Sequence, residues 1–508
     1  MSLRVALRAD ASAVIGVGHL ARCRALESAL HELGARTLLV TTRIDGTTAH
    51  FLRDAATPVR WIDAARDAAE DARLTVTAFG GARIDWVVVD HYDLDAAWHD
   101  AVRDATGARI LVIDDLADRP LAADLLLDAN RDERGSDAYR AWLKREPRRL
   151  LGPRHALLAP AYRTPRRCDP GDGRARSIGI FTGGTDPCEA STRILEACRD
   201  AAGFDGPIEV ATTRANPRLE TLRSTCRDAD ATLTIDSPDL AAFFARHDLQ
   251  VGAGGGAAWE RCRVGAPTIV LELAGNQRAV IDRLEQAGAA LAASLADGRP
   301  SGRPTLPEAL RSLIDAPDRR RALGDCAVAL VDGRGAQRVA ASLCRDTLDL
   351  RPATPDDSMR LHAWRDDPTV RAVSGDPAPI PVATHLRWFE RALADPDRRL
   401  WIGRLGHVDV GSIRFDRIGG DALEVSLYLD PALVGLGLGE RLLAAGEAAA
   451  ADWLGVPFDA VARIVPGNAA SVRLFERAGY RGEPTRVVRR IDPGAPPAGP
   501  ANTMEIPR

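Results

Sequence analysis

The chain has 508 residues, which is enough for two to four domains with sizeable hydrophobic cores. Hydrophobic residues make up 45% of it and charged residues 27%, and the formal net charge is −4, so the composition is that of a globular protein without the basic excess of nucleic-acid binders. Charges interrupt the apolar residues of the N-terminus and the longest apolar runs are strand-sized, so we expect no signal peptide, no membrane span and a cytoplasmic location.

Eight cysteines occur, all before residue 345, and none forms a CxxC pair or a cluster with zinc-ligand spacing. We therefore expect reduced, mostly buried thiols and no bound metal.

Residues 1–162 alternate short apolar runs with amphipathic stretches. "LRVAL", "ARTLLVTT", "WVVVDHY" and "ILVIDD" are typical of buried parallel strands, and "HLARCRALESALHELG" has helical apolar spacing and ends at Gly34. This alternation predicts a Rossmann-like α/β lobe whose parallel sheet is covered on both faces.

The polar, arginine-rich passage 163–177 breaks this pattern and is predicted to be a linker. Residues 178–345 then form a second α/β series, with "IGIFTGG", "IEVATT" and "LQVGAGGGAAWERCRVGAPTIVLEL" as strands and glycine loops. Two such lobes predict a ligand site between them, at the carboxyl ends of the strands.

Residues 348–490 have a different character. A strand and a helix precede an antiparallel meander with turns at Gly406 and Gly419–Gly420, which predicts an α+β domain. The tail, 491–508, is rich in proline and glycine, and we expect it to be poorly ordered.

Two motifs of this third domain point to chemistry. In "LDPALVGLGLGERLLAAGEAAA", Gly435, Gly437 and Gly439 lie between a strand and a helix, where bare amides and the helix dipole favour phosphate. Alone, this pattern equally fits an ordinary turn. In "VPGNAASVRLFERAGY", Asn468 then opens a helix that closes at Gly479. Together the motifs resemble the GNAT N-acetyltransferase superfamily over residues 348–490.

The GNAT resemblance implies acetyl-CoA as a co-substrate. The three glycines would hold its pyrophosphate, Asn468 would contact the CoA arm, and the strand "EVSLYL" would polarise the thioester carbonyl through a backbone N–H. Glu424 on that strand is a candidate base for the acceptor amine, and an ordinary exposed strand carboxylate fits equally well.

The chain departs from the GNAT pattern at two positions. Val434 stands where many members carry Arg or Gln, which removes a side-chain contact to phosphate. Phe475 stands where many members carry a tyrosine general acid, which leaves the proton donor to the departing thiolate in doubt.

The second lobe carries three further segments that suit a nucleotide. "GIFTGGTDP" ends a strand in Gly183–Gly184 and leads towards a helix near Pro187; "VGAGGGAAWERC" places Glu260 one turn into a helix, suited to two ribose hydroxyls; "LAGNQ" places Asn276 and Gln277 at a strand end. Each alone fits an ordinary turn. Their order resembles the donor-nucleotide lobe of GT-B-fold proteins such as the MurG glycosyltransferases.

The segment "RADASAVIGVGHLARC" places His19 where a glycine-rich loop becomes a helix. With "VVVDHYDLD", "VIDDLADR" and "LLGPRHALLAPAYR", the stretch from 1 to about 345 resembles the PseG family, enzymes that hydrolyse UDP-2,4-diacetamido-2,4,6-trideoxy-β-L-altropyranose in pseudaminic acid biosynthesis. The resemblance implies that His19 activates water.

A single base suffices for this chemistry because UDP departs without strong protonation, whereas ordinary glycosides need two carboxylates. The positive end of a helix dipole favours a neutral His19, which is the form that can accept a proton from water. In the predicted reaction, water attacks the anomeric carbon with inversion, and no metal is needed. Further candidates for substrate contacts surround it. Asp10, Ser12 and Gly18 suit the sugar and Arg22 suits phosphate, with Asp90, His91 and Tyr92 second in rank; each also fits local capping.

The two resemblances imply one pathway, in which a PseH-type GNAT enzyme acetylates the 4-amino group of a UDP-sugar before the hydrolase removes UDP. We therefore predict a bifunctional enzyme whose partners are a UDP-sugar and acetyl-CoA, with no nucleic acid and no membrane; contact with other nonulosonate enzymes is left open. The alternatives are a GT-B glycosyltransferase with a sugar or lipid acceptor, a nucleotide-sugar-binding module, and a GNAT domain that acts on another amine or only binds.

Overall fold

The structure is a computed structural model that describes residues 2–12, 16–43, 52, 57–164, 167–237, 239–295 and 302–493. The chain divides into two compact units, residues 1–31 with 36–339 and residues 32–35 with 340–508. The first unit holds two parallel sheets and the second holds a mixed sheet. The predicted tail beyond residue 493 lies outside the described residues.

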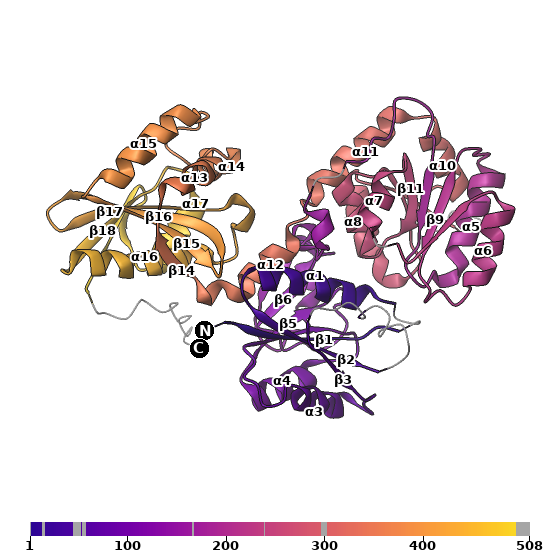
Figure 1. Cartoon of the computed structure of the whole chain (residues 1–508), viewed down its shortest axis with the longest axis horizontal. Helices are drawn as coiled ribbons and strands as arrows, with labels where there is room; N and C mark the ends of the chain where they lie inside the picture. Colours follow the sequence, from indigo (N-terminus) through magenta and orange to yellow (C-terminus); the bar gives the residue numbers. More distant parts are fainter. Residues whose placement is uncertain are drawn as a thin grey trace. The chain divides into compact units, whose positions relative to one another are not determined.

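The first sheet has seven parallel strands in the order β3-β2-β1-β4-β5-β6-β7. Helices α3 and α4 cover one face, and α1 covers the other (Figure 1). The strands are β1 (Arg4–Ala9), β2 (Arg36–Thr42), β3 (Val59–Ile62), β4 (Trp86–Asp90), β5 (Arg109–Ile113), β6 (Leu125–Asp128) and β7 (Arg148–Leu151), and the helices are α1 (Gly18–Glu32), α3 (Ala68–Ala78) and α4 (Ala96–Thr106).

The strand order of this sheet reverses between β1 and β4. Chain order runs outward from β1 through β2 and β3 on one side, and from β4 through β7 on the other. Ala9 and Asp90, the last residues of the two central strands, lie side by side in register. Ligands of doubly wound sheets bind beyond such a reversal, at the carboxyl ends of the strands, so this point is where the first lobe positions a site.

The second sheet has six parallel strands in the order β10-β9-β8-β11-β12-β13, and its order reverses between β8 and β11. Helices lie on both of its faces (Figure 1). The strands are β8 (Ile178–Phe181), β9 (Ile208–Thr212), β10 (Thr232–Ile235), β11 (Leu249–Ala253), β12 (Thr268–Leu271) and β13 (Leu291–Ala293), and the helices are α5 (Ala190–Glu196), α6 (Leu219–Asp228), α7 (Leu240–Ala245), α8 (Ala257–Val264), α9 (Arg278–Gln286), α10 (Leu306–Ile314) and α11 (Pro317–Leu330). The helix that follows them, α12 (Gly335–Cys344), lies beside the first lobe (Figure 1).

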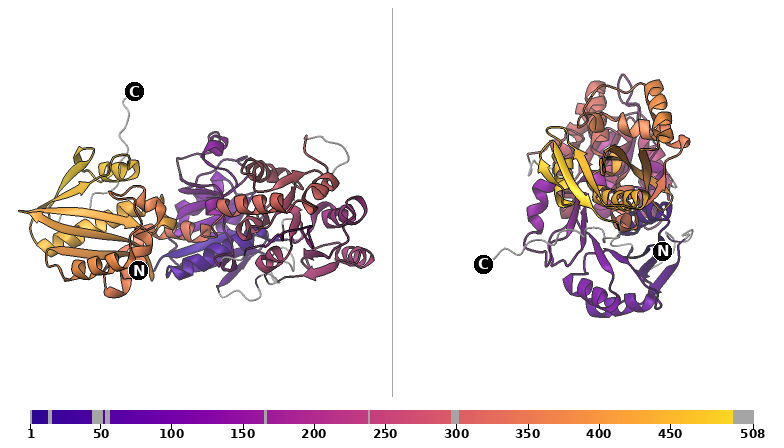
Figure 2. Two further views of the ribbon diagram at one scale, coloured as in Figure 1. Left: turned by 90° about the horizontal axis from the view of Figure 1, so that it is seen from above. Right: turned by 90° about the vertical axis from the view of Figure 1, so that its left-hand side faces the viewer.

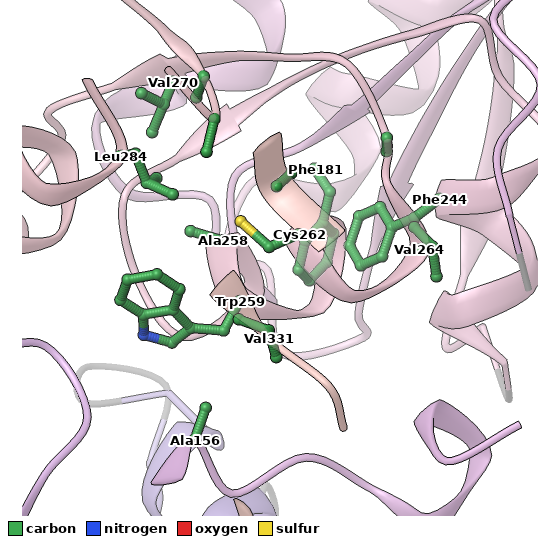
Figure 3. Close-up of a cluster of buried hydrophobic side chains, with 14 of the residues drawn as sticks. Ala156, Phe181, Phe244, Ala258, Trp259, Cys262, Val264, Val270, Leu284 and Val331 are labelled. Atoms are coloured by element: carbon green, nitrogen blue, oxygen red, sulfur yellow. The ribbon is translucent and has the colours of Figure 1, made fainter. Parts of the chain in front are cut away.

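A hydrophobic core fixes α8, the helix that follows the glycine loop of β11. Ala258 and Cys262, one turn apart on α8, point into the cluster between Phe181 and Leu284 (Figure 3). After α11, the chain returns to the first lobe. Arg338 of α12 donates there from Nη1 to the carbonyl of Arg154, which follows β7, at 2.6 Å. Two parallel α/β lobes with a returning helix make this unit GT-B-like. Residues 167–177 of the predicted linker form neither helix nor strand.

The second unit is built on one sheet in the order β14-β15-β16-β17-β18-β20-β19, antiparallel except where β17 pairs with β18. Its long strands, orange in the figures, lie side by side (Figures 1 and 2). The strands are β14 (Asp349–Pro352), β15 (Arg398–Leu405), β16 (Val408–Gly419), β17 (Ala422–Leu429), β18 (Phe458–Arg463), β19 (Arg481–Glu483) and β20 (Arg486–Ile491), and the helices are α13 (Ser358–Arg365), α14 (Pro368–Arg371), α15 (Val382–Ala394), α16 (Leu438–Leu454) and α17 (Ala469–Arg477).

The sheet of the second unit opens between β17 and β18. The two strands pair in parallel only from Ala422 to Val425, while β17 stays paired with β16 as far as Leu429. The edge of β17 from Ser426 onward therefore has no partner on the β18 side among the described strands. The predicted α/β fold class, two parallel lobes followed by an α+β domain, is confirmed.

Six of the eight cysteines are buried, while Cys188 and Cys326 are exposed, and all eight are free thiols. Within the described ranges, no helix has both the length and the hydropathy needed to cross a membrane.

Candidate functional site

His19 and Asp90 form a buried pair at the strand-order reversal of the first lobe. His19 is the second residue of α1, and its Nδ1 lies 2.7 Å from Oδ1 of Asp90, the last residue of β4. Nη2 of Arg22 also lies 3.1 Å from Nδ1, but the carboxylate is closer and only accepts hydrogen bonds, so we assign the proton to Nδ1, which donates to Asp90. The Nε2 atom of a neutral His19 is then left as an acceptor, which is the form a general base requires.

Arg22 completes the ion-pair cluster around Asp90. One turn along α1 from His19, it donates from Nε to Oδ2 at 2.9 Å and from Nη2 to Oδ1 at 2.7 Å. Burial raises the pKa of Asp90, but Arg22 and His19 outweigh it and hold the pKa below its usual value. The two side chains pair with each other because burial of either charge requires a partner. The predicted contacts of Arg22 with phosphate and of Asp90 with substrate remain predictions.

A chain of hydrogen bonds runs from this cluster into the second lobe. Nη1 of Arg22 lies 3.5 Å from Asp115, and Asn130 donates to the same carboxylate at 3.3 Å. The Asn130 Oδ1 accepts from Nε1 of Trp259, on α8, at 3.0 Å. Asp115 and Asn130 follow β5 and β6, so the ends of the three neighbouring strands β4, β5 and β6 contribute to one network.

Tyr92 and Asn276, predicted in separate lobes, lie in contact. The Asn276 Nδ2 donates to the Tyr92 hydroxyl at 3.3 Å. The Tyr92 ring also stands edge-on to His19, with 4.8 Å between ring centroids. The first lobe's candidate base is therefore two contacts away from the second lobe's "GNQ" turn.

Asp10 is buried and directly follows β1. It accepts from Nη2 of Arg8 at 2.9 Å, from the Thr42 backbone N–H at 2.7 Å, and lies 3.2 Å from Nε2 of His91. Burial raises its pKa, but His91 and Arg8 hold it far below the usual value. Both oxygens of Asp10 take part in this network. The predicted contact of Asp10 with the sugar remains a prediction.

The loop itself is described only at its two ends. Ser12 accepts from the Gly16 backbone N–H at 2.8 Å, and Gly18 is the first residue of α1. Residues 13–15 between them lie outside the described residues.

The loop after β8 differs from the predicted phosphate cradle. Gly183 has the expected positive φ, 111°, and the Gly184 carbonyl accepts from the Thr213 hydroxyl at 2.7 Å. However, a 3-10 turn follows, α5 begins only at Ala190, and Asp186 Oδ1 accepts from the Ser191 N–H at 3.0 Å. A carboxylate thus already occupies the helix N-terminus at which we expected phosphate.

The loop after β11 keeps the features predicted for a nucleotide. Gly254 leaves no room for a Cβ, which would lie 2.5 Å from Ile281. Burial raises the pKa of Glu260 to about 7, against the smaller opposing effects of Tyr162 and Arg261. Gln277, predicted to contact substrate, accepts from the Leu273 N–H at 2.9 Å through its side-chain oxygen and so closes its own turn.

The glycine loop of the second unit enters α16 through two left-handed residues. Gly435 has φ 88° and Gly437, the N-cap of α16, has φ 78°. Gly439 lies in the first turn of the helix, where a Cβ would come within 3.6 Å of Leu474. Val434 is 45% exposed beside them. The loop thus brings backbone rather than large side chains to the helix N-terminus, which suits a pyrophosphate.

Asn468 caps the next helix. Its Oδ1 accepts from the Ser471 N–H at 3.0 Å, and its Nδ2 donates to the Val373 carbonyl at 3.3 Å. A contact with CoA would therefore compete with the cap.

Glu424 lies on β17 with the same parity as Ser426 and Tyr428, so the three share a sheet face. Its Oε2 accepts from Nε of Arg463 at 2.8 Å. A role as base would require this carboxylate to leave, or to share, its arginine.

Phe475 is buried and packs edge-on against Tyr480 at 4.9 Å between centroids. The Tyr480 hydroxyl donates to Glu447 at 2.7 Å, and Nη1 of Arg489 donates to the other oxygen of Glu447 at 2.8 Å. Tyr480 therefore belongs to a buried structural network and does not replace the tyrosine that is missing at position 475.

Sequence reasoning missed the partners that complete these sites: Arg8, Asp71, Asp115, Asn130, Trp259 and Tyr162. The one available signal was polar residues directly after strands, as in "VIDDL" and "LLLDAN". Among the described residues, no group of three or more His, Cys, Asp or Glu side chains is arranged to hold a metal ion.

Comparisons with known proteins find similarity in two parts of the chain. Residues 347–481 match the family model of the acetyltransferase (GNAT) domain. The second unit contains a GNAT acetyltransferase domain. The chain is also similar to the spore coat polysaccharide biosynthesis protein SpsG of Bacillus subtilis, with 22% identity over 344 residues, which cover 67% of this chain and 98% of that protein.

Two solved structures are also similar to parts of the chain. MurG of Acinetobacter baumannii has 17% identity and a TM-score of 0.47, covering 67% of this chain and 99% of its own. The acetyltransferase YncA of Salmonella typhimurium, solved with acetyl-CoA, has 22% identity and a TM-score of 0.25, covering 30% of this chain and 98% of its own.

Proposed function

We propose that the first unit hydrolyses a UDP-sugar and that His19 is the base that activates water. The observation that carries the proposal is the 2.7 Å contact between His19 Nδ1 and Asp90, which fixes the tautomer with a free Nε2. The sugar would be UDP-2,4-diacetamido-2,4,6-trideoxy-β-L-altropyranose, as in the PseG family. The similarity to a protein named for polysaccharide biosynthesis supports a sugar substrate.

In this reaction, Nε2 of His19 removes a proton from water as the water oxygen bonds to the anomeric carbon. The bond from that carbon to the UDP oxygen breaks, its electron pair leaves with UDP, and the configuration inverts. Asp90 stabilises the imidazolium that forms, and Arg22 keeps Asp90 ionised. The loop after β11 and the N-terminus of α8 are the candidates for holding the diphosphate, with Glu260 at the ribose.

We propose further that the GNAT domain acetylates the 4-amino group of the UDP-sugar before hydrolysis. Bound acetyl-CoA supplies the acetyl group. The residues present fit it, because Gly435 and Gly437 open the N-terminus of α16 and the unpaired edge of β17 begins at Ser426. Backbone N–H groups of that edge would polarise the thioester carbonyl, and Glu424, directly or through water, would accept the amine proton.

UDP release in the absence of any sugar or lipid acceptor tests the hydrolase. Wild-type protein with the diacetamido UDP-sugar should release UDP, followed by phosphorus NMR, and His19→Ala should lose about a hundredfold or more of the rate. UDP release that requires an added acceptor would instead identify a glycosyltransferase. Full activity of His19→Ala would remove His19 from the mechanism.

A further inference from the structure

A cavity of about 390 Å³ lies in the second unit between α13, α15 and the strands β16 and β17. This volume is within the range of small-molecule sites. Ser426 and Tyr428 line it from β17, where that strand has left β18. The cavity therefore adjoins the strand edge at which the thioester is proposed to lie, on the side open to an acceptor.

The wall of this cavity is positively charged. Arg365, Arg391 and Arg414 all line it, and none of its lining residues, all within the described ranges, carries a carboxylate. Nη1 of Arg365 is buried and has no hydrogen-bond partner among the described residues. Asp416, outside the wall, lies 2.8 Å from Arg414 and offsets one of the three charges. Arg391 donates from Nε to the Arg387 carbonyl at 3.2 Å, which leaves its Nη atoms for a ligand. Three guanidinium groups in one cavity wall favour an anion, most readily phosphate oxygens.

The cavity also presents an aromatic platform. Trp388 lines it from α15, one helical turn before Arg391, and the Arg414 guanidinium lies 5.5 Å from the Trp388 ring centroid. An indole face next to cationic groups suits a planar ring that is attached to phosphate. The same three arginines would repel a polyamine or an aminoglycoside, which are polycations.

We propose that this cavity is the acceptor site and that it binds the nucleoside diphosphate end of the amino sugar. The phosphates lie against Arg365, Arg391 and Arg414, and the base lies on Trp388. The proposal rests on the proposed acetyltransferase function.

The proposal also orders the two reactions. Hydrolysis removes the group that the cavity recognises, so acetyl transfer must precede UDP release on the same sugar.

Titration of the full-length protein with UDP, followed by calorimetry, tests the cavity. Wild-type protein should bind two UDP molecules per chain, one of which Glu260→Ala weakens in the first unit. Arg391→Ala should weaken the other by about tenfold or more. Arg387→Ala is the matched control, because Arg387 is an exposed arginine on the same helix that does not line the cavity. Trp388→Ala should act on the same site as Arg391→Ala.

The proposal would be overturned if the protein bound only one UDP per chain and lost it in Glu260→Ala. It would also be overturned if Arg391→Ala and Trp388→Ala left the affinities of both UDP sites unchanged. Acetylation of spermidine at a rate that UDP does not change would have the same consequence. An acetyl-transfer assay separates this failure from that of the proposed function. If acetyl-CoA and the amino UDP-sugar yield no CoA, while Arg391→Ala still weakens a second UDP site, the proposed acetyltransferase function is wrong but the cavity does bind UDP. If CoA is released but UDP does not compete with the acceptor, the cavity assignment fails.

Discussion

His19 Nδ1 and Asp90 Oδ1 lie 2.7 Å apart, although 71 residues separate the two in sequence. Asp90 ends β4, His19 begins α1, and the reversal of strand order between β1 and β4 brings the two elements together. Arg22 then balances the charge of Asp90, so the pair is held in one geometry.

Replacing Asp90 by Asn tests the role of the carboxylate. An amide at this position would donate to Nδ1 and move the remaining imidazole proton to Nε2, which abolishes the base. We expect Asp90→Asn to lower kcat for UDP release by about a hundredfold or more, with little change in KM. Asp93→Asn, an exposed aspartate in the following turn, is the control and should retain full activity. Equal activity of both variants would exclude the proposed positioning role.

Glu260 makes nucleotide binding depend on pH. Burial raises its pKa to about 7, so the carboxyl is protonated below that pH and ionised above it. Ribose hydroxyls donate to the ionised form, so affinity for UDP should rise as the pH increases through 7 and fall by up to about tenfold per unit below it. Glu260→Gln should lose this dependence. Calorimetry of both proteins between pH 5.5 and 8.5 measures it, and the ratio of the two affinities removes the titration of UDP itself. A constant ratio would contradict the assignment.

The two ends of α16 offer a matched pair of glycines for testing the CoA loop. Gly437 precedes the helix with φ 78° and Gly455 follows it with φ 68°. Alanine at either position should lower the free energy of unfolding by about 1–2 kcal/mol, because both residues are left-handed. Only Gly437→Ala should raise KM for acetyl-CoA. Chemical denaturation and CoA-release kinetics separate the two effects, and an equal KM for both variants would argue against the loop as a pyrophosphate site.

Tyr480→Phe tests whether Tyr480 acts as the general acid in place of the tyrosine that is missing at position 475. The Tyr480 hydroxyl donates to Glu447, whose pKa burial raises. Loss of this hydrogen bond should destabilise the protein by about 1–3 kcal/mol, seen as a lower Tm, and should leave kcat for acetyl transfer unchanged. A large fall in kcat at unchanged Tm would instead make Tyr480 the proton donor.

The layout of the fold followed from the sequence because buried parallel strands and glycine turns are local features. The turns at Gly406 and Gly419–Gly420, the helix after Gly18 and the glycine loop before α16 all lie where they were predicted. A 3-10 turn begins at Pro187 as predicted, but α5 itself begins only at Ala190, because Cys188 and Glu189 adopt left-handed conformations that local patterns do not reveal.

The candidate site was predictable as a place but not as a set of contacts. His19, Tyr92 and Asn276 were chosen because they end strands or begin helices, and the structure brings them together. The sequence did not predict the side-chain partners of Arg22 and Asp10 within the protein, since Asp90 and Thr42, which pair with them, are distant in sequence. The arginine-lined cavity was missed for a similar reason: Trp388 and Arg391 by themselves look like one face of an ordinary amphipathic helix.

Hydrolysis in water enriched in oxygen-18 tests the central claim most directly, because the claim is that His19 directs water to the sugar. Mass spectrometry of the UDP released by wild-type protein should show no label, since the oxygen from water bonds to the anomeric carbon. The rate of UDP release by His19→Ala should be lower than that of the wild-type protein by about a hundredfold or more. Label in the terminal phosphate of UDP, or unchanged release by His19→Ala, would contradict the account.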